Sequence, residues 1–250
     1  MNIVVEEISF KSGEAKIVGR LYRPEEIGGK FPSVVLCHGF PGDTKNIDLA
    51  EDLAFNDYVA LVFYYQGAWG SSGKYTLAKL EENTKDAIEY VLSKPYVDQN
   101  RLALIGHSMG SVPVSKTISN NRTVKTAVFL SPGTNFNKFI SLRGRKKHLA
   151  FLLRIGKGKL AGLNRKDLLE DLKWVNLNSN PLNTIKKATI PVLVVVGSKD
   201  DITSPKSCKL LYQIANEPKE YREIFGADHF FLRHRVIMID NVISWLKGHL

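Results

Sequence analysis

The sequence predicts one α/β domain built on a mostly parallel sheet flanked by helices, and three observations carry that prediction. Short apolar runs alternate with helical patterns along most of the 250 residues, which is typical of parallel strands joined by right-handed crossovers. Most of these runs are apolar throughout, as expected of strands that helices cover on both faces. One of the runs leads directly into a tight turn with a serine at its apex.

The individual elements follow from local patterns. Two runs near the start, 3–10 and 15–22, flank Lys-Ser-Gly-Glu and predict a hairpin. Apolar residues at helical spacing predict a crossover helix over 77–92 and a closing helix over 230–250. The runs that predict buried strands lie at 33–37, 58–63, 101–105, 124–130, 190–196 and 221–225.

The segment 134–187 departs from this alternation and is too long for a simple connection. It contains two helical patterns, one over 145–155 and a second that begins after Asn164, a suitable N-cap. The glycine-rich stretch between them, 156–162, is predicted to be mobile. We interpret the whole segment as a helical cap inserted into the domain.

Charge separates this cap from the core, which consists of 1–133 and 188–250. The cap has 13 Lys and Arg against 3 Asp and Glu, whereas the core has 22 of each, so the net charge of +10 belongs to the cap. Three interpretations remain open: a solvated basic surface, a field that attracts an anionic substrate, and contact with an anionic membrane surface. Nucleic-acid binding is not expected, because aromatic residues do not interleave regularly with the basic ones.

Other features bear on the compartment and on cofactors. The N-terminus lacks a signal-peptide pattern, and no apolar run approaches the ~18 residues of a membrane span, so we expect a cytoplasmic protein without stable membrane insertion. Cys37 and Cys208 are expected to be buried reduced thiols. We expect no metal and no cofactor, because the histidines lack ligand spacing and no phosphate-binding glycine loop occurs. A homodimer is left open.

The serine turn is Gly106-His107-Ser108-Met109-Gly110, and it has the G-x-S-x-G pattern that exposes a serine hydroxyl above a sheet. A serine nucleophile needs a base and an acid that orients the base. Gly-Ser-Lys-Asp-Asp after the strand at 190–196 offers Asp200 and Asp201, and Gly-Ala-Asp-His-Phe places His229 before the last helix. We therefore predict a Ser-Asp-His triad in that chain order.

An oxyanion site needs two backbone N–H groups near the serine. Met109, the residue after the nucleophile, supplies one, and the loop His38-Gly-Phe-Pro-Gly42 after a strand supplies the other. Phe40 is the predicted donor in that loop, because Pro41 has no N–H.

These motifs, with Tyr-Tyr-Gln-Gly-Ala-Trp-Gly-Ser-Ser-Gly at 64–73, resemble in order and spacing the α/β-hydrolase superfamily, in particular its small serine esterases and acyl-peptidase-like members. The likeness covers about 30–133 and 188–250. It implies an α/β-hydrolase sheet, and it implies Asp200 as the acid, with Asp201 in reserve. It also implies a cap that varies freely between members.

The function predicted on these grounds is hydrolysis of carboxylic esters through an acyl-enzyme, with a small-molecule ester as substrate, an anionic one if the basic cap acts as an attracting field. Alternatives that use the same triad are a thioesterase, an acyltransferase and a peptidase. A non-catalytic ligand-binding relative is the alternative from another class. Tyr65 and Trp69 are candidates for the substrate pocket, although packing roles suit both equally well.

Overall fold

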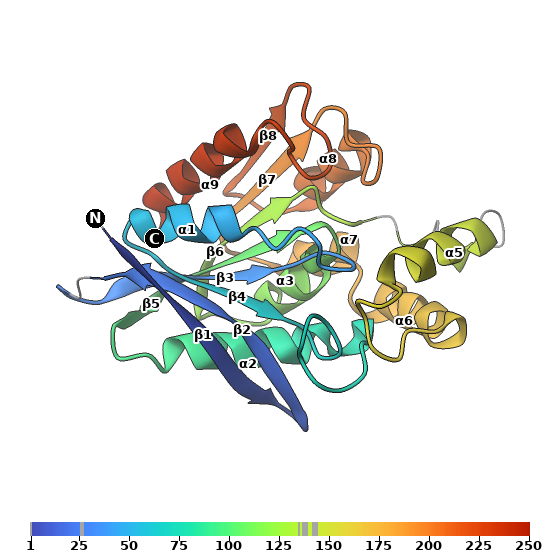
Figure 1. Ribbon diagram of the computed structural model, residues 1–250. Helices are drawn as coiled ribbons and strands as arrows, with labels where there is room; N and C mark the ends of the chain where they lie inside the picture. The colour runs from blue at the N-terminus through green and yellow to red at the C-terminus, as the bar shows by residue number, and fades with distance from the viewer. Residues whose placement is uncertain (1, 26–27, 135, 137–139, 142–144) are drawn as a thin grey trace.

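The computed structural model describes residues 2–25, 28–134, 136, 140–141 and 145–250. Within these residues an eight-stranded sheet has the order β1-β2-β4-β3-β5-β6-β7-β8 (Figure 1). The strands are β1 Ile3–Ser12, β2 Ala15–Pro24, β3 Phe31–Cys37, β4 Val59–Tyr64, β5 Val97–His107, β6 Val124–Leu130, β7 Val192–Gly197 and β8 Lys219–Ile224. β2 is antiparallel to β1 and to β4, and all other neighbours are parallel.

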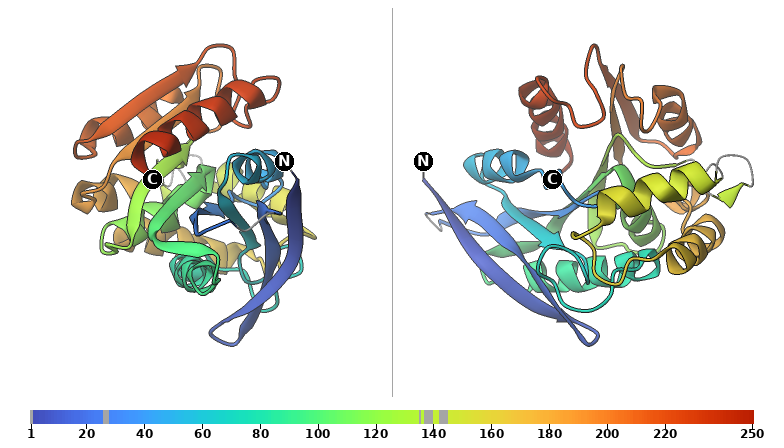
Figure 2. Two further views of the ribbon diagram at one scale, coloured as in Figure 1. Left: turned by 90° about the vertical axis from the view of Figure 1, so that its left-hand side faces the viewer. Right: turned by 45° about the vertical axis from the view of Figure 1, so that its right-hand side comes forward.

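Helices cover both faces of the sheet. The described helices are α1 Ile47–Phe55, α2 Leu80–Leu92, α3 Ser111–Ile118, α5 Arg145–Gly156, α6 Arg165–Asn178, α7 Pro181–Thr184, α8 Pro205–Ile214 and α9 Arg235–His249. α1 and α9 pack on one face, and α2, α3 and α8 on the other (Figures 1 and 2). β3 shows why the strand runs are apolar throughout: Val34 packs with the first group and Val35 with the second.

Two elements differ from the sequence prediction. α8 was not expected, although Ser204 caps it by accepting a hydrogen bond from the Ser207 amide and Pro205 occupies its first turn. α9 begins at Arg235 and not at 230, because the Asp228 carboxylate accepts the amides of Phe230 (3.0 Å) and Leu232 (2.9 Å) and forms a turn there.

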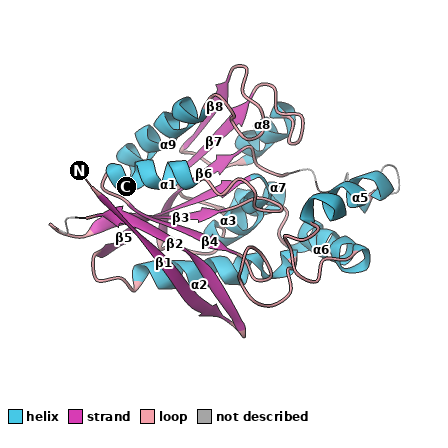
Figure 3. Cartoon of the chain, viewed as in Figure 1, coloured by secondary structure: helices cyan, strands magenta, loops and turns pink. Residues whose placement is uncertain are grey.

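The helices α5 and α6 lie at one end of the sheet, beside loops that follow its strands (Figure 3). Asn164 caps α6 as predicted, since its side chain accepts the Asp167 amide at 3.0 Å. The Asp171 carboxylate attaches α6 to the core by accepting the Thr76 hydroxyl (2.6 Å) and the Leu77 amide (2.8 Å). Every described helix is too short or too polar to cross a lipid bilayer.

The glycines of 156–162 suggested a mobile segment, but backbone hydrogen bonds tie this stretch to the core. The Ala161 amide donates to the Gly67 carbonyl at 2.7 Å, and the Tyr75 amide donates to the Ala161 carbonyl at 2.9 Å. Gly158 and Gly162 have φ of 75° and 70°, so these glycines supply tight turns in a segment that is bonded to the core.

Candidate active site

The serine turn sits at the carboxyl end of β5, near the middle of the sheet. Ser108 has φ of 54°, a left-handed value that a serine adopts only when its surroundings impose it. A Cβ on Gly106 would lie 2.7 Å from the Gly110 carbonyl oxygen, and one on Gly110 would lie 2.0 Å from that of Cys37. Both glycines are therefore required for the tight strand-to-helix packing that presents Ser108.

The structure brings Asp200 and His229 together. His229 Nδ1 lies 2.9 Å from Asp200 Oδ2, and both side chains are buried. Asp201 is exposed, whereas the hydrogen bond to His229 is made by Asp200, so the geometry favours Asp200 of the two adjacent acids. Since a carboxylate only accepts, Nδ1 carries the proton, which leaves Nε2 of the neutral ring as an acceptor.

The Asp200 carboxylate is held by more than the histidine. Its Oδ1 accepts the amides of Ile202 (2.9 Å) and Thr203 (2.7 Å), and its Oδ2 accepts the Thr203 hydroxyl (2.8 Å). Burial raises the pKa of Asp200, but the hydrogen bonds from His229 and Thr203 outweigh it and leave the pKa below its ordinary value. The acid is therefore ionised at neutral pH.

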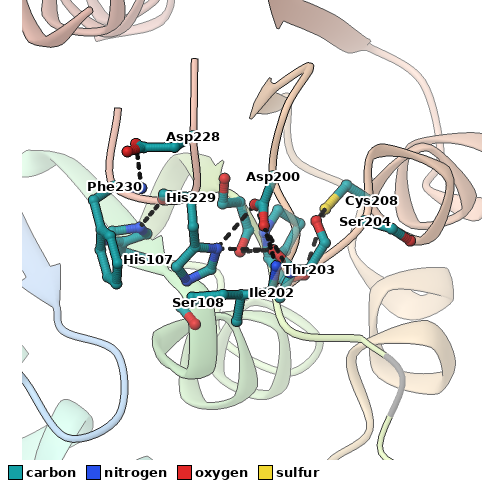
Figure 4. Close-up of polar contacts among 12 residues, drawn as sticks. His107, Ser108, Asp200, Ile202, Thr203, Ser204, Cys208, Asp228, His229 and Phe230 are labelled. Carbon is teal, nitrogen blue, oxygen red and sulfur yellow. Dashed lines mark hydrogen bonds and ion pairs between the residues drawn. The ribbon is translucent and has the colours of Figure 1, made fainter. Parts of the chain in front are cut away.

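Ser108 and His229 line the same cavity, and Figure 4 shows the histidine ring between Asp200 and Ser108. No hydrogen bond joins the side chains of Ser108 and His229, both of which are among the described residues. Such contacts are often long before a substrate binds.

Two residues that the sequence prediction did not assign to the site support His229. The Thr203 hydroxyl lies 3.1 Å from His229 Nδ1 and 3.0 Å from the Ser131 carbonyl oxygen, so it ties the acid loop to the end of β6. His107 Nε2 donates to the His229 carbonyl at 3.0 Å. Burial first, and the nearby His229 second, lower the pKa of His107 to about 3, so His107 is a neutral donor. His107 occupies a variable position within the serine turn and Thr203 lies three residues after Asp200, and the sequence carries no further signal for either residue.

The two predicted oxyanion donors also flank the serine. A Cβ on Gly39 would lie 2.9 Å from Ser108 Cβ, so the loop that carries the Phe40 amide packs directly on the nucleophile. Met109 is the second residue of the 3₁₀ turn Ser108–Gly110 that leads into α3, and amides in a first helical turn have no acceptor within the helix. Phe40 and Met109 both line the cavity.

The cavity has a volume of about 770 Å³ and lies between the sheet and the cap. α5 contributes His148, Phe151, Leu152 and Ile155, which share one face of the helix. The exposed residues Lys146, Lys147, Arg154 and Lys157 lie elsewhere on α5 and just beyond its end, outside the cavity.

Comparison with known proteins identifies the family. Residues 30–167, more than half of the chain, match the family model described as serine aminopeptidase, S33. The chain is an α/β hydrolase of this family.

This hydrolase has similar proteins across bacteria and archaea. An uncharacterized protein of Mycobacterium tuberculosis is 28% identical over 224 residues, which cover 89% of this chain and 72% of the relative. A hypothetical protein of Pseudomonas aeruginosa has a TM-score of 0.81 at 17% identity, covering 99% of this chain and 94% of that one. An esterase of Pyrococcus furiosus has a TM-score of 0.74 at 18% identity, covering 99% and 93%. The structural matches concern the fold.

The two predicted pocket aromatics of the hydrolase do not line the described cavity. Tyr65 is 1% exposed and packs against Phe63 and His38 in the core. Trp69 is turned toward the outside of the 38–42 loop, where its indole N–H donates to the Pro41 carbonyl at 2.8 Å. Of the two roles that the sequence left open for these residues, pocket lining and packing, the described contacts favour packing.

Proposed function

We propose that this hydrolase cleaves carboxylic esters through a covalent acyl-enzyme. The observation that carries the proposal is a buried, hydrogen-bonded Asp200–His229 pair that shares a cavity with Ser108. This is the arrangement of an activated serine nucleophile.

In the first half-reaction Ser108 Oγ attacks the ester carbonyl carbon while His229 Nε2 accepts the hydroxyl proton. The negative oxygen of the tetrahedral intermediate is held by the amides of Phe40 and Met109. Collapse breaks the bond to the alcohol, and His229 returns the proton to the leaving oxygen. Asp200 stabilises the imidazolium in between.

In the second half-reaction water takes the place of the alcohol. His229 removes a proton from the water, the resulting hydroxide attacks the acyl carbon, and the carboxylic acid leaves as Ser108 recovers its proton. Both halves use one set of donors, so a single preorganised site serves the whole reaction.

The cavity lining supports a neutral, apolar acyl group. Phe151, Leu152 and Ile155 form its cap-side wall. Among the described lining residues the charged side chains of Asp43 and Asp201 occur, but no lysine or arginine does. The described lining offers an anionic substrate no lysine or arginine, so we propose neutral esters and assign the described basic residues of α5 to the solvent side.

The experiment is a p-nitrophenyl ester series from acetate to palmitate, with Ser108→Ala as the control. We expect turnover that disappears in the variant. Activity that survives in Ser108→Ala would disprove the assignment of the nucleophile. A wild-type enzyme without turnover at any chain length would disprove ester hydrolysis.

A second candidate is aminopeptidase activity, which the family's name and one observation favour. The exposed residue Asp201 lines the same cavity as His229, and a carboxylate there is a suitable partner for the ammonium group of a peptide N-terminus. Aminoacyl p-nitroanilides test it: a peptidase would cleave them and lose affinity for them in Asp201→Asn, whereas an esterase would leave them intact.

A further inference from the structure

We infer that Trp69 is a positioning residue that fixes the Phe40 amide of the oxyanion site from behind. The inference rests on the proposed function, because it concerns the loop that holds the developing oxyanion. It also gives Trp69 a role other than the substrate contact that the sequence suggested.

The loop 38–42 is confined on two sides. On the side of the nucleophile, Gly39 leaves no room for a Cβ, which would lie 2.9 Å from Ser108 Cβ. On the opposite side, a Cβ on Gly42 would lie 2.7 Å from Trp69 Nε1 and 2.7 Å from His38 Nδ1. Phe40 lies between Gly39 and Gly42 in the chain, so the close contacts at both glycines restrict where its amide can lie.

Trp69 provides the polar contact of the outer side. Its Nε1–H donates to the Pro41 carbonyl at 2.8 Å, one residue after Phe40. A rotation of the Phe40–Pro41 segment that moved the Phe40 amide away from Ser108 would displace this carbonyl and break the hydrogen bond. The indole thereby opposes movement of the oxyanion donor.

Trp69 is itself held firmly enough to do this. Its φ is 50°, an uncommon value for a residue with a side chain, within a loop where the Ser71 amide donates to the Ala68 carbonyl at 2.9 Å. The Lys45 ammonium lies 3.8 Å from the centroid of the indole ring, which is the geometry of a cation–π contact. The backbone turn and the Lys45 contact on the ring face thus fix the position of Trp69. Its indole N–H then holds the 38–42 loop through the Pro41 carbonyl.

The test substitutes Trp69→Phe, which keeps a smaller aromatic ring for Lys45 and removes the N–H donor. We expect kcat for a p-nitrophenyl ester to fall about tenfold with KM changed less than about twofold, because the interaction acts on the transition state. Trp245→Phe is the matched control, since Trp245 also donates its indole N–H at 2.8 Å, to Thr126, on the far side of the sheet.

A second readout separates positioning from general damage. Ser108 Oγ adds to the carbonyl carbon of an alkyl trifluoromethyl ketone, His229 takes the proton, and the resulting oxyanion occupies the oxyanion site. We expect Trp69→Phe to weaken inhibition by the ketone by the same factor as kcat, and to leave binding of the corresponding non-reactive alcohol unchanged.

The inference is wrong if Trp69→Phe keeps wild-type kcat, if it loses kcat without losing ketone affinity, or if Trp245→Phe loses as much. These outcomes differ from a failure of the proposed function, which is a wild-type enzyme that turns over no ester. Ketone binding to such an enzyme would still test the position of the loop, because the addition step needs only Ser108, His229 and the oxyanion donors.

Discussion

The two walls of the cavity are built on different principles. On the sheet side, the groups around Ser108 are fixed by hydrogen bonds. The Asp200 carboxylate, for example, accepts hydrogen bonds from His229, Ile202 and Thr203. On the cap side, α5 offers mainly the apolar side chains of Phe151, Leu152 and Ile155. Hydrogen bonds are directional and fix atoms to a fraction of an ångström, whereas apolar contacts depend on volume. The sheet side is suited to chemistry and the cap side to selection of the acyl group.

The largest effect should come from removing the acid on the sheet side. In Asp200→Asn the carboxamide no longer stabilises the imidazolium and favours the wrong tautomer of His229, so we expect kcat to fall about 10⁴-fold. Asp201→Asn is the matched control, and we expect it to keep ester turnover within about threefold. If both variants retained activity, the acid would have to be sought elsewhere.

A second effect should appear in the stability of the sheet side as the pH falls. Burial, the largest cause for both, lowers the pKa of His38 to about 4 and of His107 to about 3. Below the unfolded value of about 6.5 the unfolded chain therefore binds protons that the folded protein excludes. The free energy of unfolding should fall by about 1.4 kcal/mol per histidine for each pH unit between roughly pH 6 and 4. Above that range these two histidines should not lower the free energy of unfolding.

Urea unfolding followed at several pH values measures this slope. His107→Gln removes one of the two histidines and should make the dependence shallower, whatever it does to the stability at pH 7. An equal slope in wild type and variant would show that His107 is protonated in the folded protein.

Thr203→Val should have a smaller effect on catalysis than the loss of Asp200. The valine has the same shape but no hydroxyl for Asp200, His229 and the Ser131 carbonyl, so we expect kcat/KM to fall about tenfold. Thr203→Ser should restore most of the activity. A shared loss in both variants would instead indicate a packing role for the methyl group.

The smallest effect on rate, and the sharpest contrast with the sheet side, is expected from the cap. Leu152 lines the cavity and Leu149 is buried in the cap without lining it. Each alanine variant should lose about 2–5 kcal/mol of unfolding free energy. Only Leu152→Ala should move the preferred ester toward longer acyl chains, as a p-nitrophenyl ester series would show. The same preference in both variants would mean that α5 does not select the acyl group.

The sheet side was also the more predictable of the two from the sequence. Continuous apolar runs located the buried strands, and the glycines around Ser108 and the loop of His229 indicated where the polar groups of the sheet edge would gather. The family match confirms the superfamily and the fold class. Asp200 could be separated from Asp201 only by resemblance, because adjacent acids in a loop carry no periodicity; the structure separates them by burial.

The missed features have physical reasons. His107 contributes through one hydrogen bond to His229, far away in the chain, and Thr203 through bonds to Asp200, His229 and Ser131; no periodic pattern of the sequence encodes such contacts. For Trp69 a pocket role and a packing role stayed open, because the sequence does not show on which side of a loop an aromatic residue lies. The glycines of 156–162 indicate tight turns as readily as mobility, and only the pairing of Ala161 with Gly67 decides between these interpretations.

The composition of the hydrogen-bonded group around His229 has a consequence for how such an enzyme can diversify. The described bonds to Asp200, Thr203 and His229 come from residues before 134 or after 187, so none depends on the cap. Descendants of this chain can therefore replace or reshape α5 and acquire new substrates one mutation at a time, while the reaction itself is inherited intact.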